Sequence, residues 1–517
     1  MQILDCTLRD GGYYTDWDFD EALVDTYFSS FNELPVDYLE IGYRSIPLKG
    51  YFGQYFYCSE DTLQWVKERT NKKLAIILNE KDIRAEHTEE LLSPCKGIIT
   101  MIRVAVDPAN FDRAIELAKS IKRMGFEVAF NVMYMSNWKE REGFLDSISS
   151  VNGLVDYFYC VDSFGGVYPN EVKETISEVK SKLSCKVGFH GHNNLELGLI
   201  NTLTALEYGA DIVDATVTGM GRGAGNLKTE LLLTALSKQK GLKLDYNQLS
   251  TVVNAFTELQ QHHGWGTSLP YMVSGANSLP QKEVMEWVTK RFYSFNSIIR
   301  ALDNRREGKQ DNVSVPQFQP STDQSTTRVL LIGGGPSAAS HKVAVRSMIE
   351  KVKNLAIVHA SSKNAAHYID LDVPQYFCLV GNEGHRLEQS FEDFGHFRGI
   401  CVLPPYPRQM GTYIPTRVQD KTFELKQVTF TQLVKDSHTA LALQTILDIQ
   451  AQEVLVIGYD GYKEGNVGQL EISLMQENNQ LFQDFQDYGQ LDIASLVPTQ
   501  YGSLSVNSLY SLLAQYE

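Results

Sequence analysis

The feature that most constrains the fold is a regular alternation of short apolar runs and longer amphipathic stretches in the first half of the chain. Runs of this length, rich in Val, Ile, Phe and Tyr, are typical of buried strands. Eight of them occur: QILDC (2–6), VDYLEIGY (36–43), KLAIIL (73–78), GIITMIRVA (97–105), EVAFNVM (127–133), VDYFYCVD (155–162), KVGFHGH (186–192) and IVDATV (212–217). Eight strands, each followed by a helical pattern, predict a (β/α)8 TIM barrel. An open doubly wound sheet is the alternative, and the eightfold count favours the barrel.

A chain of 517 residues is too long for one hydrophobic core, since single domains rarely exceed roughly 250–300 residues. We expect the barrel over residues 1–280, a helical extension over 281–306 and a polar, proline-containing linker over 307–327. A second α/β pattern fills residues 328–517. Its runs RVLLIGGGPS, NLAIVHAS, QYFCLVG, GICVLPP and EVLVIGYDGY predict parallel strands of an open Rossmann-like sheet.

Charge and composition narrow the class of partner. The formal net charge is −16 and no long Lys/Arg run occurs, which argues against nucleic acid or an anionic membrane as a partner. No apolar stretch approaches the ~18 residues of a membrane span, and the first residues do not read as a signal peptide. The seven scattered cysteines contain no C-x-x-C pair, so reduced thiols and a cytoplasmic location are expected.

Polar residues follow three of the predicted strands. They are DCTLRDGGY (5–13) after the first, FHGHNN (189–194) at the seventh and GMGRGAGN (219–226) after the eighth. These strands are neighbours in a closed barrel, so the three segments can meet. His190 and His192 are two apart in an extended segment and face the same side. With Asp10 they form a nitrogen and oxygen set that suits Mg²⁺, Mn²⁺, Zn²⁺ or Fe²⁺.

LDCTLRDGG, HGHNN and GMGRGAGN together resemble the DRE-TIM metallolyase superfamily over about residues 1–280. That superfamily includes 4-hydroxy-2-oxovalerate aldolase, hydroxymethylglutaryl-CoA lyase and isopropylmalate synthase. VDSFGG (161–166) is similar to a segment of the aldolase branch. The resemblance implies a divalent-metal-dependent aldolase that makes or cleaves a carbon–carbon bond through the enolate of a 2-oxo acid such as pyruvate, with an aldehyde or ketone as second substrate.

The resemblance also assigns residues. It implies one divalent ion, with Mn²⁺ or Mg²⁺ favoured and Zn²⁺ or Co²⁺ as alternatives, and a homodimer. Arg9 matches the arginine that stabilises the enolate oxygen, and Ser163 matches a substrate contact of the aldolases. The positions that match metal ligands are Asp10, His190, His192 and, as a fourth ligand seen in the lyase branch, Asn226.

The sequence departs from the aldolases at the general base. They carry a histidine three residues after the metal-binding aspartate, and this chain has Tyr13 there. Tyrosine, with an ordinary pKa near ~10, is a weak base at neutral pH. Tyr13 is predicted either to transfer the proton or only to shape the pocket, and Asp16 and Asp18 are further candidates.

Two arginines close to the predicted rim are candidates for substrate binding. Arg44 follows the second strand, and Arg103 is predicted to end the fourth. Either could hold a carboxylate or phosphate through a bidentate hydrogen bond. The alternative for each is an ordinary surface ion pair.

The turn LIGGGPS in the second half predicts a phosphate site, because such strand-to-helix turns expose backbone amides. Its candidate contacts are Gly333, Gly335 and Ser337. The turn is not G-x-G-x-x-G, which argues against NAD. It faintly resembles nucleotide-handling domains of the bacterial sialyltransferase type, so we expect a nucleotide or nucleotide-sugar ligand. The barrel's aldehyde would then be sugar-derived or nucleotide-linked. A tight turn without ligand is the alternative.

Two other functions are alternatives for the barrel. A Claisen-type acyl-CoA lyase or synthase is disfavoured because the lyase branch carries a cysteine in its glycine-rich loop, and GRGAGN has none. A non-catalytic barrel that serves the C-terminal domain as scaffold or sensor is disfavoured because Arg9, Asp10, His190 and His192 are all present.

Overall fold

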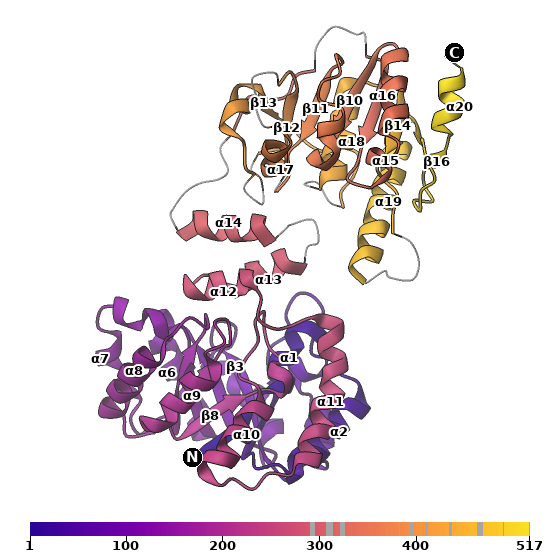
Figure 1. The fold of residues 1–517 in the computed structure, drawn as a ribbon. Helices are drawn as coiled ribbons and strands as arrows, with labels where there is room; N and C mark the ends of the chain where they lie inside the picture. Colours follow the sequence, from indigo (N-terminus) through magenta and orange to yellow (C-terminus); the bar gives the residue numbers. More distant parts are fainter. Residues whose placement is uncertain are drawn as a thin grey trace. The chain divides into compact units, whose positions relative to one another are not determined.

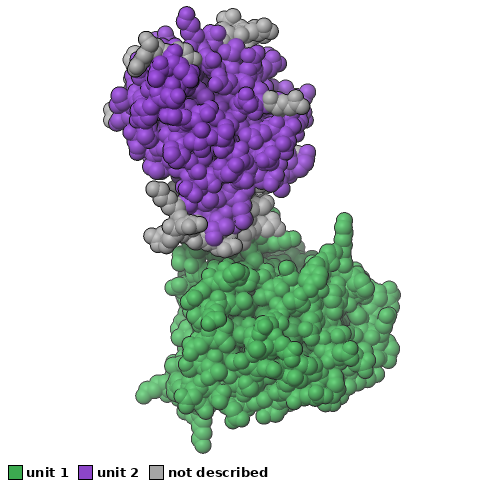
Figure 2. Space-filling view, turned by 90° about the vertical axis from the view of Figure 1, so that its right-hand side faces the viewer, with its two compact units in different colours: residues 1–286 green, residues 287–517 purple. Residues whose placement is uncertain are grey.

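A computed structural model of the protein describes residues 1–289, 295–306, 314–320, 326–381, 383–391, 397–406, 408, 412–433, 437–462, 469–489 and 491–515. The chain divides into two compact units, Met1–Glu286 and Trp287–Glu517 (Figure 2). Each unit contains its own sheet and its own hydrophobic core.

The first unit is a closed barrel of eight parallel strands in sequence order (Figure 1). Closure is visible in the first strand, where Leu4 is paired with Tyr38 on one side and with Asp214 on the other. The predicted barrel is therefore confirmed, and each of the eight apolar runs coincides with one strand. The strands are β1 (Gln2–Asp5), β2 (Tyr38–Tyr43), β3 (Lys73–Asn79), β4 (Ile99–Val106), β5 (Glu127–Val132), β6 (Tyr157–Asp162), β7 (Lys186–Gly191) and β8 (Ile212–Ala215).

Amphipathic helices surround the barrel, and α6 (Phe111–Arg123) shows why they form. Phe111, Ala114, Leu117 and Ile121 are buried, and their three- and four-residue spacing places them on one helical face. The other α-helices of this unit are α1 (Thr7–Thr15), α2 (Glu21–Glu33), α3 (Gln54–Tyr57), α4 (Glu60–Lys67), α5 (Thr88–Leu92), α7 (Phe144–Ser147), α8 (Pro169–Lys182), α9 (Gly198–Glu207), α10 (Thr229–Lys240), α11 (Tyr246–His263), α12 (Leu269–Ala276) and α13 (Gln281–Thr289), which runs across the boundary of the units.

The barrel interior is apolar at one end and polar at the other. Tyr38, Tyr157 and Ile212 each begin a strand and belong to a small interior cluster. Charged side chains lie further along the strands, among them Glu40 and Asp214. Side chains thus fill the amino-terminal end of the barrel, and the carboxyl-terminal end is left for chemistry.

The polar segment after β1 is a helix, α1, which follows directly on Cys6. Its two glycines allow close packing. A Cβ atom on Gly11 would lie 2.5 Å from Met220 Sδ, and one on Gly12 would lie 2.1 Å from Trp17 Cδ1. These residues are therefore glycines because neighbouring side chains occupy the space.

The second unit is an eight-stranded parallel sheet in the order β13-β12-β11-β10-β9-β14-β15-β16. This confirms the predicted open α/β sheet. Three short strands, β13, β15 and β16, were not predicted. The strands are β9 (Arg328–Ile332), β10 (Leu355–His359), β11 (Gln375–Cys378), β12 (Ile400–Leu403), β13 (Thr422–Glu424), β14 (Glu453–Ile457), β15 (Asp492–Ser495) and β16 (Ser505–Val506).

Helices cover both faces of this sheet (Figure 1). Along β9, Val329 and Leu331 pack in one core cluster with α18, whereas Leu330 and Ile332 pack in another with α16. Alternate residues of a strand face opposite sides, so the strand is apolar throughout. The helices are α14 (Phe295–Arg306), α15 (Ser337–Ser340), α16 (Lys342–Lys351), α17 (Glu383–Ser390), α18 (His438–Ile449), α19 (Gln469–Gly489) and α20 (Leu509–Ala514).

Part of the predicted linker packs against the second sheet. Within the described stretch 314–320, Phe318 is buried and its backbone N–H donates to the Glu424 carbonyl at 2.7 Å. The predicted helical extension contains α13 and α14. All seven cysteines are unpaired. Among the described helices, none has the length and apolar character that crossing a membrane requires.

Candidate active site

The structure brings together the four residues that the sequence predicts as metal ligands. Asp10 lies in the first turn of α1, His190 in β7, His192 just beyond it and Asn226 after β8. Asp10 Oδ2 accepts a hydrogen bond from Asn226 Nδ2 at 2.7 Å and lies 3.9 Å from His190 Nε2. The imidazole rings of His190 and His192 have centroids 5.0 Å apart.

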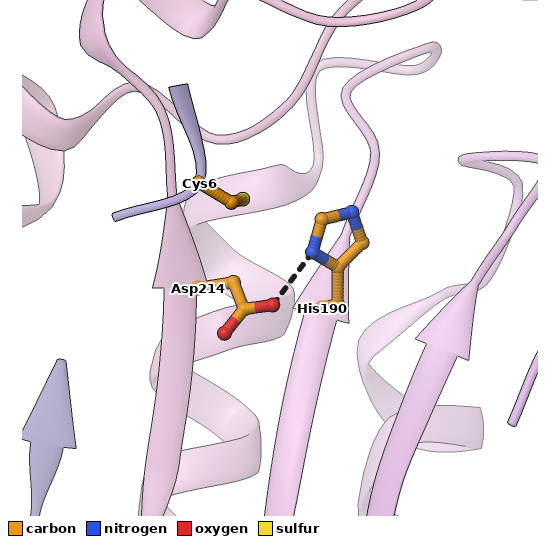
Figure 3. A group of neighbouring side chains, drawn as sticks. All are labelled: Cys6, His190 and Asp214. Atoms are coloured by element: carbon orange, nitrogen blue, oxygen red, sulfur yellow. Dashed lines mark hydrogen bonds and ion pairs between the residues drawn. The ribbon is translucent and has the colours of Figure 1, made fainter. Parts of the chain in front are cut away.

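Both imidazoles are held by their Nδ1 atoms. His192 Nδ1 lies 2.7 Å from the Asp162 carbonyl oxygen, which can only accept, so this nitrogen carries the proton. His190 Nδ1 lies 2.8 Å from Asp214 Oδ2 (Figure 3). Each ring therefore has Nε2 left to bind a metal, which is the usual arrangement of metal-bound histidines.

Burial and neighbouring charges keep His192 and Asp10 in their deprotonated forms. Burial and the neighbouring His190 lower the pKa of His192 to about 3. Burial opposes ionisation of Asp10, but Arg9 and the two histidines lower the pKa of this carboxyl. A neutral imidazole and a carboxylate are the forms that coordinate a metal.

One buried oxygen atom without a hydrogen-bond partner indicates that a cation would fit between the candidate ligands. Asn226 is 3% exposed, and its Oδ1 has no hydrogen-bond partner although its Nδ2 donates to Asp10. Buried amide oxygens are nearly always paired. A divalent ion beside Asp10 would satisfy Oδ1, and the donor set of one carboxylate, one amide oxygen and two imidazoles suits Mn²⁺ or Mg²⁺.

A second group of potential ligands overlaps this set. Cys6 Sγ, a ring nitrogen of His190 and a carboxylate oxygen of Asp214 lie within 4.8 Å of one another (Figure 3). Burial and the Asp10 carboxylate raise the pKa of the Cys6 thiol, which disfavours the thiolate that a metal needs. Asp214 Oδ2 already accepts from His190 and Arg103. We therefore assign Asp214 to orienting His190.

A chain of alternating charges lies beneath the candidate ligands. Arg9 is ion-paired with Asp10 and, through Nε, with Glu40 at 2.8 Å. Glu40 accepts from Arg103 at 2.9 Å, and Arg103 is paired with Asp214 in turn. All five side chains are buried. The two carboxylates at the ends of this chain therefore have fixed positions beside the histidines.

Neither of the two arginines proposed for substrate binding has a free guanidinium edge. Arg103 is fully buried, because β4 continues three residues beyond it, and its nitrogens donate to Asn131, Glu40 and Asp214. The structure thus places Arg103 inside the barrel and not at the predicted rim. Arg44 donates to backbone carbonyls, at 2.8 Å to Leu91 and at 3.1 and 3.0 Å to Tyr57 and Cys58.

The other predicted site residues surround the mouth of the barrel. Tyr13 is half-buried, and its hydroxyl lies 3.2 Å from that of Tyr43. Ser163 is also half-buried, and its Oγ accepts from the Tyr134 backbone N–H at 2.8 Å. Asp18 is exposed and accepts from the Gln54 backbone N–H.

Sequence reasoning missed four residues that shape this site: Cys6, Glu40, Asp214 and Arg222. Glu40 and Asp214 had a signal, since each is an isolated carboxylate within a run of buried apolar strand residues. A charge in that setting needs a buried partner. Arg222 stands out only in three dimensions, where its guanidinium lies 4.0 Å from the centre of the Tyr13 ring.

In the second unit three backbone amides of the glycine turn are already used. Gly333 and Gly335 donate to the carbonyls of Ile457 and Gly458, at 2.8 and 2.7 Å. The N–H and Oγ of Ser337 both contact Asp460 Oδ2, at 3.3 and 3.1 Å. A phosphate at this turn would have to displace a carboxylate of the chain itself. The turn nevertheless lines a cavity of about 620 Å³.

Comparisons with known proteins agree with this geometry. The HMGL-like family model matches residues 1–257. The 4-hydroxy-2-oxovalerate aldolase of Thermomicrobium roseum is 31% identical over 243 residues, which are 46% of this chain and 67% of that enzyme. The corresponding enzyme of Pelotomaculum thermopropionicum is 33% identical over 244 residues, 46% of this chain and 70% of that enzyme.

One solved structure is considerably more similar in sequence. It is the crystal structure of the N-terminal domain of a proposed aldolase from Bacteroides vulgatus. It is 57% identical with a TM-score of 0.56, and the match covers 58% of this chain and all of that domain.

Proposed function

This chain belongs to the HMGL-like family of carbon–carbon lyases and aldolases, and from that membership we propose that its barrel is a divalent-metal-dependent aldolase acting on a 2-oxo acid, pyruvate being the simplest. The observation that carries the proposal is the convergence of Asp10, His190, His192 and Asn226 from α1, the end of β7 and the loop after β8. Both imidazoles there present Nε2.

These four side chains would hold one divalent ion, Mn²⁺ or Mg²⁺ in preference to Zn²⁺ or Co²⁺ because no thiolate takes part. When bound, the ion would act as a Lewis acid toward the keto oxygen of the 2-oxo acid. Arg9 binds Asp10 and Glu40 and keeps Nη2 without a hydrogen bond among the described residues. That single nitrogen is suited to donate to the substrate oxygen and stabilise negative charge on it.

Tyr13 is the proposed proton carrier. It lies one helical turn after Asp10 in α1, half-exposed at the mouth, with its hydroxyl beside Tyr43 and its ring beneath the Arg222 guanidinium. In cleavage it would take the proton from the substrate hydroxyl, and in condensation it would return it. Ser163 remains a candidate for substrate contact, Arg44 remains one only through its Nη2 group, and for Arg103 we propose a positioning role through Asp214.

The test follows the methyl protons of pyruvate by NMR in D₂O. Metal-loaded protein should exchange them with deuterium, a chelator should stop the exchange, and Mn²⁺ should restore it. Asp10→Asn should abolish both metal binding and exchange. Absence of exchange in the metal-loaded protein would overturn the proposed function and would favour a non-catalytic barrel.

A second assay, which follows the CoA products, distinguishes the proposed aldolase from an enzyme that acts on acyl-CoA. A Claisen-type synthase would release free CoA thiol from acetyl-CoA and a 2-oxo acid, and an acyl-CoA lyase would release acetyl-CoA from a 3-hydroxyacyl-CoA. An aldolase would do neither. The glycine-rich loop 219–226, which contains no cysteine, supports the aldolase. Thiol release at the rate of pyruvate exchange would support the synthase.

The nature of the aldehyde is a finer proposal. We expect a sugar-derived or nucleotide-linked acceptor, on the argument that the barrel is joined to a second domain with its own cavity. Mass spectrometry after incubation with pyruvate and sugar aldehydes should show a product longer by three carbons. If simple aldehydes react and no sugar or nucleotide-sugar aldehyde does, the acceptor proposal is wrong and the aldolase proposal stands.

For the second unit, nucleotide binding is proposed at the cavity and not on the amides of the glycine turn. The cavity lies at the carboxyl ends of β9, β10 and β14, where the strand order reverses, and ligands of open α/β sheets bind at such switch points. Lys363 lines it and has no ion pair among the described residues. Calorimetry with CMP, UDP and their sugar conjugates should show binding that Lys363→Gln weakens and Lys351→Gln does not. No binding would overturn it.

A further inference from the structure

Arg9, Arg44 and Arg103, the three arginines described above, are already engaged by other groups of the protein. Arg9 and Arg103 are neutralised by buried carboxylates, and Arg44 donates to three backbone carbonyls. None of these three guanidinium groups therefore has a pair of free N–H groups that could bind an anionic group of the second substrate.

Arg222 is different. It is half-buried in the loop between β8 and α10, and among the described residues no carboxylate lies within ion-pair distance of it. Its guanidinium lies over the Tyr13 ring, 4.0 Å from the centroid. A ring partner satisfies one face of a guanidinium and leaves the N–H groups at its edge for other contacts. Its positive charge is maintained, because the neighbouring Tyr13, Tyr43 and Asp10 raise the pKa of the guanidinium against the effect of burial.

The loop holds Arg222 in a fixed position. Gly225 N–H donates to the Arg222 carbonyl at 3.1 Å, and Asn226 N–H donates to the Gly219 carbonyl at 3.0 Å. Gly219, Gly223 and Gly225 all have positive φ angles, between 64° and 77°, which favour glycine. Arg222 is thus anchored four residues from Asn226, one of the proposed metal ligands.

Burial places Arg222 on the open side of the site. Asp10 and His190 are each 3% exposed, whereas Tyr13 and Arg222 are half-buried. A 2-oxo acid bound next to Asp10 would lie deeper than the Arg222 guanidinium. The second reactant would then approach from the open side, past Arg222 and Tyr13. The chain's net charge of −16 would otherwise disfavour an anion there.

We propose that Arg222 determines specificity by binding an anionic group, a carboxylate or a phosphate, on the aldehyde that reacts with the 2-oxo acid. This inference rests on the proposed aldolase function. Arg222 would act through a charge-assisted, bidentate hydrogen bond at the edge that Tyr13 leaves free.

Matched aldehydes test the proposal and separate the two anions. Glyoxylate is compared with glycolaldehyde, and glyceraldehyde 3-phosphate with glyceraldehyde, each with pyruvate and Mn²⁺. In at least one pair, kcat/KM for the anionic member should exceed that of the neutral one by about 10- to 100-fold, the range expected of a hydrogen bond to a charged group. The pair that shows the preference identifies the carboxylate or the phosphate.

Substitutions test whether the preference for anionic aldehydes depends on Arg222. Arg222→Gln should reduce the ratio to near unity, chiefly through KM for the anionic aldehyde, and Arg222→Lys should keep part of it. Arg123→Gln, an exposed arginine at the far end of α6, is the matched control and should keep the full ratio. Mn²⁺ affinity, measured in the same preparations, checks that the loop around Asn226 is intact.

Three outcomes would overturn the inference. Wild-type protein could show no preference for either anion, or Arg222→Gln could keep the preference. Arg222→Gln could also slow neutral and anionic aldehydes by the same factor, which would mean that Arg222 only supports the Tyr13 ring. In all three cases wild-type exchange of pyruvate protons would persist. Loss of that exchange in the wild type would instead refute the aldolase, and this inference with it.

Discussion

Asp214 accepts the Nδ1–H of His190 at 2.8 Å with Oδ2, the same oxygen that Arg103 binds. Burial opposes ionisation of Asp214, but Arg103 and His190 lower the pKa of its carboxyl. The pair therefore fixes the tautomer and direction of a proposed metal ligand from inside the barrel. Several expectations follow from this relationship and from its neighbours.

Asp214→Asn should weaken metal binding without removing a ligand. An amide holds the His190 ring less strongly than a carboxylate, and loss of such an orienting group typically costs about 10- to 100-fold in metal affinity. Calorimetric titration with Mn²⁺ measures it. Asp211→Asn is the control, because that carboxylate contacts Lys180 and the Val187 N–H instead. Equal affinities in wild type and Asp214→Asn would show that the Asp214 contact does not tune the site.

Asp10→Asn and Cys6→Ser distinguish the two overlapping groups of potential ligands. If the ion is held by Asp10, His190, His192 and Asn226, Asp10→Asn should reduce bound Mn²⁺ below detection, whereas Cys6→Ser should leave the stoichiometry unchanged. Metal analysis of dialysed protein provides the readout. The reverse pattern would assign the ion to Cys6, His190 and Asp214.

Arg103→Met should destabilise the barrel strongly. It removes the cation between Glu40 and Asp214, and breaking a buried ion pair by removing one partner costs about 3–5 kcal/mol. Urea unfolding followed by tryptophan fluorescence reports on the barrel, since four of the five tryptophans lie within Met1–Glu286. Lys119→Met, which removes an exposed ion pair with Glu116, should cost less than about 1 kcal/mol. Similar losses in the two variants would contradict the buried network.

Tyr13→Phe should lower turnover by about 10²-fold or more if the hydroxyl transfers a proton, with Mn²⁺ affinity unchanged. Tyr14→Phe is a close control, because it removes the adjacent hydroxyl, which donates to the Gly223 carbonyl at 3.3 Å. Turnover by Tyr13→Phe within a few-fold of wild type would reduce Tyr13 to a residue that shapes the pocket.

His359 in β10 should make the second unit sensitive to acid. It is buried, stacked on Phe377 and bonded to Gln375, and burial lowers its pKa to about 4. Below the unfolded value of ~6.5 the unfolded state binds the proton more readily, so stability present above that pH is lost as pH falls toward 4. The shift corresponds to about 3 kcal/mol.

The measurement compares wild type with His359→Gln, which has no titrating group at this position. Hydrogen exchange of β10 and β11 peptides, near neutral pH and near pH 4, gives the local free energy of unfolding. The wild type should lose about 3 kcal/mol more than the variant over that interval. A parallel decline in both proteins would show that other groups cause the acid sensitivity.

Much of the fold could be predicted because its signal is local. The barrel strands are apolar runs such as KLAIIL and GIITMIRVA, buried on both faces. Strands β13 (Thr422–Glu424) and β16 (Ser505–Val506) were missed because two or three residues with polar members carry no periodicity. The helix α1 was not predicted because Gly11 and Gly12 are poor helix formers, and their packing against Met220 and Trp17 is not visible in sequence.

From the residues themselves, the site could be predicted only where its side chains lie close together in the sequence. His190 and His192 are two residues apart, and their shared direction follows from strand geometry. The pairing of Glu40 with Arg103 joins β2 to β4 across the barrel interior, a contact that no spacing in the chain reveals. Arg103 was misplaced for the same reason, since the extent of β4 beyond it depends on the neighbouring strands.

The pairing of β1 with β8 has a consequence for synthesis of the protein. Asp10 is translated early, but β8, which closes the barrel by pairing with β1, and Asn226 leave the ribosome about two hundred residues later. The nascent chain therefore cannot bring all four proposed ligands together until β8 and the loop after it have emerged from the ribosome. Ribosome-bound fragments that stop before β8 should be unable to retain the ion, however well their earlier strands have formed.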